Sequence, residues 1–180
     1  MTMKRIGVFC SSRGEIRNEY IEAARLLGRE IGRRGAAMVY GGSACGLMDV
    51  AANAVHEAGG QTIGAIPRLL MERNLAADPD VAFYCENLDD RKSTMVREAD
   101  VFVALPGGIG TLDEIFTVVA ANTIGYHGKK VILYNVCGFW NPLLDMLAKI
   151  KDENMIGSHT DRTLEVADTP EKLFVKIFGE

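Results

Sequence analysis

A glycine-rich junction at residues 106–111, PGGIGT, limits most strongly what this chain can fold into. It follows a short apolar run at 101–105, VFVAL, which is typical of a buried β-strand, and it precedes a mostly apolar stretch from residue 115 that is long enough for a helix. Glycines at such a junction let the backbone turn sharply and approach a ligand closely. The free N–H groups of a helix start favour an anion such as phosphate. The junction therefore predicts a phosphate-binding turn between a strand and a helix.

Thr111 and Glu114 inside this junction have two interpretations. A Thr-x-x-Glu ahead of an apolar run is a capping box, in which the two side chains satisfy backbone donors at the helix start. The glycines and the strand before it favour a site instead, with Glu114 as an acid beside the bound anion. The two interpretations predict different directions for the Glu114 side chain.

Apolar runs and helical periods alternate along the whole chain. Strands are expected at 6–10, 37–40, 62–66, 81–84, 101–105 and 130–134, with a small edge strand at 163–166, and helices lie between them. This alternation predicts an α/β fold, a doubly wound, mainly parallel sheet with helices on both faces, in one domain over residues 1–180. The small-residue loops at 11–14, 41–46 and 107–111 each follow a strand, so they are expected to open at one edge and form one crevice.

Composition excludes several classes of partner and location. The formal net charge of −4 gives no basic field for nucleic acid. The four cysteines are far apart and form no C-x-x-C pair, which favours reduced thiols in a cytoplasmic protein. The first residues lack the apolar region of a signal peptide, and no run reaches membrane-spanning length. The three histidines are isolated, so a metal site is not expected. No cofactor is expected either.

The glycine loops fit none of the common nucleotide or hydrolase motifs. Asp113 stands where the dinucleotide fingerprint G-x-G-x-x-G requires its third glycine, and Gly41-Gly42 has the wrong spacing. The chain contains no G-x-x-x-x-G-K-[ST] and no G-x-S-x-G. A P-loop triphosphatase and an α/β-hydrolase are therefore excluded.

Residues 106–114, PGGIGTLDE, resemble the P-G-G-x-G-T-x-x-E signature of the LOG family, whose members are cytokinin riboside 5′-monophosphate phosphoribohydrolases. The likeness extends over most of the chain: residues 7–12 resemble the family's opening strand and turn, and residues 39–42 with 46–48 its second glycine loop. Arg91-Lys92 with Met95 and Arg97 resembles its R-K-x-x-M helix, and residues 134–136 with 138–140 the strand and turn after the motif. Many members were once labelled lysine decarboxylases, but no lysine here is marked as a partner for pyridoxal phosphate.

The resemblance implies a Rossmann-like fold, usually in a homodimer, and an enzyme that cleaves the N-glycosidic bond of a purine nucleoside 5′-monophosphate to free base and ribose 5-phosphate. The family's catalytic arginine and glutamate fall on Arg91 and Glu114, and its phosphate-binding turn on residues 108–111. Arg91 is expected on an exposed helix face. Substrate or phosphate contacts are expected from Ser11, Gly42, Ser43, Lys92, Met95, Gly107, Gly108, Ile109, Gly110 and Thr111.

Residues near the expected base pocket depart from the plant-like members. Residues 119–123 read VAANT where those members carry tryptophans and a W-A-Q segment, and Asp49 replaces a glycine. Plain AMP or another purine monophosphate is therefore a candidate substrate beside an N6-modified adenine nucleotide. The alternative function is a nucleotide or molybdenum-cofactor (pterin) carrier that binds without turnover. Residues 115–124 are apolar around nearly the whole helix, which predicts that this helix forms part of a two-fold dimer interface near the crevice in addition to core packing.

Overall fold

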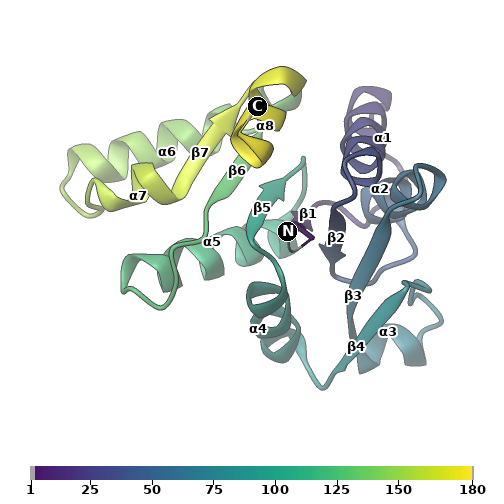
Figure 1. Ribbon diagram of the computed structural model, residues 1–180. Helices are drawn as coiled ribbons and strands as arrows, with labels where there is room; N and C mark the ends of the chain where they lie inside the picture. Colours follow the sequence, from purple (N-terminus) through teal and green to yellow (C-terminus); the bar gives the residue numbers. More distant parts are fainter. Residues whose placement is uncertain (1–2, 180) are drawn as a thin grey trace.

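The computed structural model describes residues 3–179 and contains a single, entirely parallel sheet (Figure 1). Its strand order is β4-β3-β2-β1-β5-β6-β7, with every neighbouring pair parallel. The strands are β1 (Arg5–Phe9), β2 (Ala37–Tyr40), β3 (Gln61–Pro67), β4 (Val81–Cys85), β5 (Val101–Ala104), β6 (Val131–Tyr134) and β7 (Leu164–Ala167). The predicted α/β class, the alternation of elements and the small strand near residue 164 are confirmed.

Helices connect successive strands. They are α1 (Asn18–Arg33), α2 (Gly46–Glu57), α3 (Arg68–Glu72), α4 (Leu88–Glu98), α5 (Ile109–Thr123), α6 (Asn141–Asp152), α7 (His159–Thr163) and α8 (Pro170–Phe178), with a 3₁₀ turn η1 (Val136–Gly138). The sequence pattern does not predict α7 and η1, because both are too short to carry a helical period of their own. No helix within residues 3–179 is long and apolar enough to cross a membrane.

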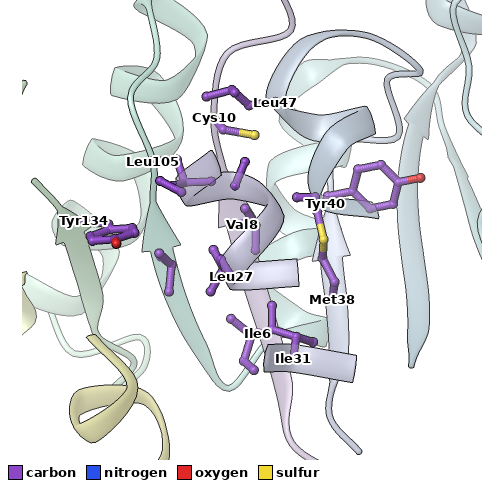
Figure 2. Close-up of a cluster of buried hydrophobic side chains, with 14 of the residues drawn as sticks. Ile6, Val8, Cys10, Leu27, Ile31, Met38, Tyr40, Leu47, Leu105 and Tyr134 are labelled. Atoms are coloured by element: carbon purple, nitrogen blue, oxygen red, sulfur yellow. The ribbon is translucent and has the colours of Figure 1, made fainter. Parts of the chain in front are cut away.

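Two apolar layers cover the sheet, because successive side chains of each buried strand point to opposite faces. Ile6 and Val8 of β1 pack with α1, α2 and α8 on one face. Figure 2 shows this layer, with Cys10 and Leu47 at the end of the cluster nearest the loops. Phe9 points to the other face, which α4, α5 and α6 cover, and its ring stacks on that of Phe102 at 5.0 Å. The doubly wound prediction is therefore confirmed.

The winding reverses between the two central strands, β1 and β5. From β1 the chain proceeds to β2, β3 and β4 on one side of the sheet, whereas from β5 it proceeds to β6 and β7 on the other. The loops after β1 and β5 therefore separate and leave a crevice at the carboxyl ends of these strands, where doubly wound proteins bind ligands. The N–H of Ser11 donates to the carbonyl of Pro106 at 3.2 Å and holds the floor of this crevice together.

Candidate active site

A cavity of about 430 Å³ occupies the crevice at the ends of β1 and β5. Its wall consists of the loop after β1, the first two turns of α5, one arginine from α4 and one methionine from α2. The lining residues are Cys10, Ser11, Ser12, Arg13, Met48, Arg91, Gly108, Ile109, Gly110, Thr111 and Glu114. The structure therefore brings Arg91 and Glu114 together with most of the predicted glycine turn and with Ser11.

The glycine turn presents unpaired backbone donors to this cavity. The cap residue of α5 is Gly108, and no side chain caps the helix there. The hydrogen bond from Leu112 N to Gly108 O, 3.0 Å long, closes the first turn, so the N–H groups before it have no acceptor within the helix. A β-carbon at Gly107 would lie only 2.1 Å from Oγ1 of Thr111. Gly107 thus permits the close approach that brings the buried Thr111 against the turn.

The capping-box interpretation of Thr111 and Glu114 is wrong. The helix begins at Ile109, so Thr111 is its third residue and not its cap. Glu114 lies a further turn inside the helix, where its side chain cannot reach back to the backbone at the helix start.

The Glu114 carboxylate pairs with the guanidinium of Arg91. Nη2 of Arg91 donates to Oε1 of Glu114 at 2.6 Å, and the side chains are 12% and 1% exposed. The expectation of an exposed Arg91 is therefore wrong, because α4 packs against α5 at this point and covers the side chain. Nε of Arg91 is also buried and has no acceptor among residues 3–179. Nη1 lies 3.1 Å from the position of a β-carbon on Gly41, so the second glycine loop borders Arg91.

Burial changes the proton affinity of two groups at the cavity floor. Loss of solvation raises the pKa of Glu114 to about 7, with Arg91 acting in the opposite direction and Asp113 adding to the rise. Burial and the neighbouring Glu114 both raise the pKa of the Cys10 thiol. Glu114 therefore exchanges a proton near neutral pH, whereas Cys10 stays a thiol.

Several predicted contact residues do not line this cavity. Lys92 donates to Asp113 at 2.9 Å and so forms a second ion pair between α4 and α5, beside the first. Met95 is buried in the core under α4. Gly42 and Ser43 pair with the segment 75–77 through Ala77 N to Gly42 O and a bridge between Ser43 and Ala76. Gly107 lines a neighbouring cavity.

Four lining residues were absent from the predicted contacts: Cys10, Ser12, Arg13 and Met48. Cys10, Ser12 and Arg13 follow β1 directly, at the same sheet edge as the glycine turn. Their position in the sequence could therefore have predicted their place at the cavity. Met48 belongs to the first turn of α2, after the second glycine loop. Its place at the wall depends on the packing of α2 beside α1, which the sequence pattern does not specify.

Solved structures of two molybdenum cofactor proteins share this fold. The molybdenum cofactor binding protein from Rippkaea orientalis gives a TM-score of 0.72 at 22% identity, over 99% of this chain and 98% of that chain. The molybdenum cofactor carrier protein from Chlamydomonas reinhardtii gives a TM-score of 0.75 at 21% identity, over 98% and 96%. At these identities the likeness concerns the fold alone.

Sequence comparison is more specific. A family model described as "Possible lysine decarboxylase" matches residues 48–177. The probable cytokinin riboside 5′-monophosphate phosphoribohydrolase LOGL2 of Oryza sativa subsp. japonica is 38% identical over 175 residues, 97% of this chain and 72% of the relative. The cytokinin riboside 5′-monophosphate phosphoribohydrolase LOG5 of Arabidopsis thaliana is 42% identical over 154 residues, 85% and 68% respectively. With the Arg91–Glu114 pair and the glycine turn in one cavity, and relatives at this identity over nearly its full length, the chain belongs to the LOG family.

Proposed function

We propose that this protein hydrolyses the N-glycosidic bond of a purine ribonucleoside 5′-monophosphate, releasing the free base and ribose 5-phosphate. The observation that carries the proposal is the Arg91–Glu114 pair in the same cavity as the open start of α5. One part of the cavity suits an anion, and the other holds a carboxylate that titrates near neutral pH. A nucleoside monophosphate has the matching groups, a 5′-phosphate and a glycosidic carbon.

The phosphate end of the substrate lies against the first turn of α5 in this proposal. The N–H groups at Ile109, Gly110 and Thr111 precede the first helical hydrogen bond, and the helix dipole adds about half a positive charge. The Thr111 hydroxyl is buried beside Gly107 and adds a donor. Ser11, in the loop after β1, offers a second hydroxyl.

The carboxylate of Glu114 acts at C1′ of the ribose. Cleavage of a ribosyl–base bond develops positive charge on the sugar, and a nearby carboxylate stabilises that charge. Arg91 occupies Oε1, which leaves Oε2 to orient a water molecule and accept its proton. The water oxygen bonds to C1′ while the bond from C1′ to the purine nitrogen breaks. The electron pair of that bond leaves with the base, which takes up a proton from solvent.

Arg91 positions Glu114 and binds the substrate in this scheme. A guanidinium does not release its proton at neutral pH, so Arg91 is no proton donor to the base. Its buried Nε has no acceptor among the described residues. A buried donor without a partner favours an acceptor from a ligand, which here is the phosphate or the departing base.

The proposed substrates are AMP and N6-modified adenine nucleotides, and the protein is proposed to act as a cytoplasmic homodimer without a cofactor. The decisive experiment is incubation of the purified protein with AMP, followed by chromatography for free adenine and ribose 5-phosphate. The proposal is supported if adenine and ribose 5-phosphate are released in equal amounts and if this release is lost in Glu114→Gln. Saturable binding of AMP without any adenine contradicts it and favours the carrier function instead.

A further inference from the structure

Arg13 stands where two cavities meet. A second cavity of about 310 Å³ lies on the other side of the loop after β1, between the start of α1 and Phe139. Ser11 and Arg13 are the residues that line both cavities. Arg13 is exposed and therefore borders the substrate cavity at its rim, whereas the Arg91 side chain is buried.

The backbone that carries Arg13 is held from three directions. Leu47 N donates to the carbonyl of Ser11 at 2.9 Å, and Ser11 N donates to Pro106 O at 3.2 Å. Arg13 N donates to Oγ of Ser11 at 3.1 Å. Gly46, at φ +64°, approaches so closely that a β-carbon there would lie 2.5 Å from the carbonyl oxygen of Arg13. These contacts hold the loop in place at the rim of the cavity.

Arg13 forms no ion pair within residues 3–179, unlike the cations around it. Within residues 3–179 its exposed side chain has no carboxylate within ion-pair distance. Arg91 is neutralised by Glu114, and Lys92 by Asp113. Arg17, the next arginine along the chain, pairs with Glu19 at 2.8 Å and lies over the Tyr20 ring.

A phosphomonoester at neutral pH needs such a cation. It carries between about −1.5 and −2 charges, whereas the start of α5 supplies about half a positive charge. The positive charge of Arg91 is already offset by Glu114 in the empty site. We propose that Arg13 binds the 5′-phosphate from the rim and so selects 5′-monophosphates over nucleosides. This inference rests on the position of the phosphate in the proposed function.

Arg13→Ala and Arg17→Ala form a matched pair that tests the proposal. Both remove one arginine from the same exposed segment, but Arg17 does not line the substrate cavity. For Arg13→Ala we expect KM for AMP to rise roughly 10- to 100-fold, the scale of one charge-assisted hydrogen bond, with kcat within about threefold. Arg13→Lys should recover part of the loss, and Arg17→Ala should match the wild type.

Calorimetric binding of ribose 5-phosphate separates this inference from the proposed function, because it requires no turnover. Weaker binding of ribose 5-phosphate in Arg13→Ala, but not in Arg17→Ala, supports the role of Arg13. This holds even if the wild type releases no adenine from AMP, because the absence of release refutes only the proposed hydrolysis. In the kinetic assay, the role of Arg13 is overturned by an unchanged KM in Arg13→Ala, by a fall in kcat alone, or by equal effects of the two variants. In the binding assay, it is overturned if the wild type does not bind ribose 5-phosphate.

Discussion

Nη2 of Arg91 lies 2.6 Å from Oε1 of Glu114, although the two residues are 23 positions apart and belong to different helices. Both side chains are almost fully enclosed. Taking two charges out of water is costly, and their attraction offsets that cost only while both partners are present. A buried ion pair of this kind therefore contributes little net stability to the fold. Its position at the wall of the cavity is better explained by chemistry on a ligand.

Replacement of Glu114 by glutamine is expected to remove activity without unfolding the protein. The amide oxygen can still accept the hydrogen bond from Arg91, but the amide cannot take a proton from water. We expect adenine release from AMP to fall by at least about 100-fold, the scale on which general bases act. Asp113→Asn, on the same helix but half-exposed and paired with Lys92, should retain activity. Steady-state assays and circular dichroism measure both effects, and an active, folded Glu114→Gln would refute the proposed role.

Replacement of Arg91 by alanine is expected to destabilise the fold in a pH-dependent way. It leaves Glu114 buried without its partner, so the folded-state pKa of this carboxyl rises still further above its unfolded value of about 4.3. The folded state then binds the proton more tightly, so stability falls as pH rises above about 4.3. In the variant this fall continues above pH 7, where it levels off in the wild type. We expect a loss of about 3 kcal/mol at pH 8 and a smaller loss at pH 5.5.

Urea unfolding at the two pH values measures this difference. Arg97→Ala is the control, because Arg97 is an exposed arginine on the same helix and its partner, Glu98, keeps a second ion pair with Arg5. Its effect should stay within about 0.5 kcal/mol at both pH values. Equal losses for Arg91→Ala at pH 5.5 and pH 8 would show that the removed side chain acted through packing and not through charge.

The order of strands and helices was predictable because each buried strand is a short apolar run and α1, the longest helix, has a clear polar face. α7 escaped prediction because its five residues, HTDRT, contain no apolar period and bury only Thr163. The start of α5 was predictable only to within the junction at residues 106–111. Ile109 is 83% exposed and Gly110 is a poor helix former, so neither marks the first turn of the helix, which begins at Ile109.

The site was predictable where it depends on one continuous segment. Gly107 of this turn is required by a close contact with Thr111, which lies in the same short segment. The environment of Arg91 was not predictable in the same way. The burial of the Arg91 side chain depends on the contact between α4 and α5, and the sequence pattern does not predict how these two helices are oriented relative to each other. Gly42 and Ser43 were expected at the ligand because their loop opens at the same edge, but the segment 75–77 pairs with them.

The protein is expected to distinguish AMP from adenosine. The open start of α5 contributes to binding only if the substrate carries an anionic 5′ group. We expect adenine release from AMP and none, or far slower release, from adenosine at equal concentration. Chromatography of both reactions gives the ratio. Comparable rates would mean that the glycine turn serves the fold and not the phosphate.

A homodimer is expected through the far end of α5. Ile124, Tyr126 and Met155 are 70%, 80% and 76% exposed, and an apolar hollow of about 430 Å³ lies beside Ile124 and Met155. An apolar surface of this kind is typical of an interface, and a second copy of the chain is the proposed partner. We expect a dimeric mass in sedimentation at micromolar concentration, lost in Ile124→Glu but kept in Leu69→Glu, an exposed leucine on α3. A monomeric wild type would contradict this.

The pH dependence of hydrolysis reports which form of Glu114 works. The pKa of this carboxyl is raised to about 7 by burial, so the group is mainly protonated below pH 7 and mainly ionised above it. In the proposed scheme only the carboxylate stabilises the ribosyl cation and accepts a proton from water. We therefore expect kcat/KM for AMP to rise about tenfold per pH unit below 7 and to level off above it.

The 5′-phosphate itself titrates near pH 6, and the residual activity of Glu114→Gln separates the two groups. That variant should lose the inflection near pH 7 and keep only the change that belongs to the substrate. A wild-type kcat/KM that falls as pH rises from 6 to 8 would mean that Glu114 acts in its protonated form. Glu114 would then be the proton donor to the departing base, and the water would need another base.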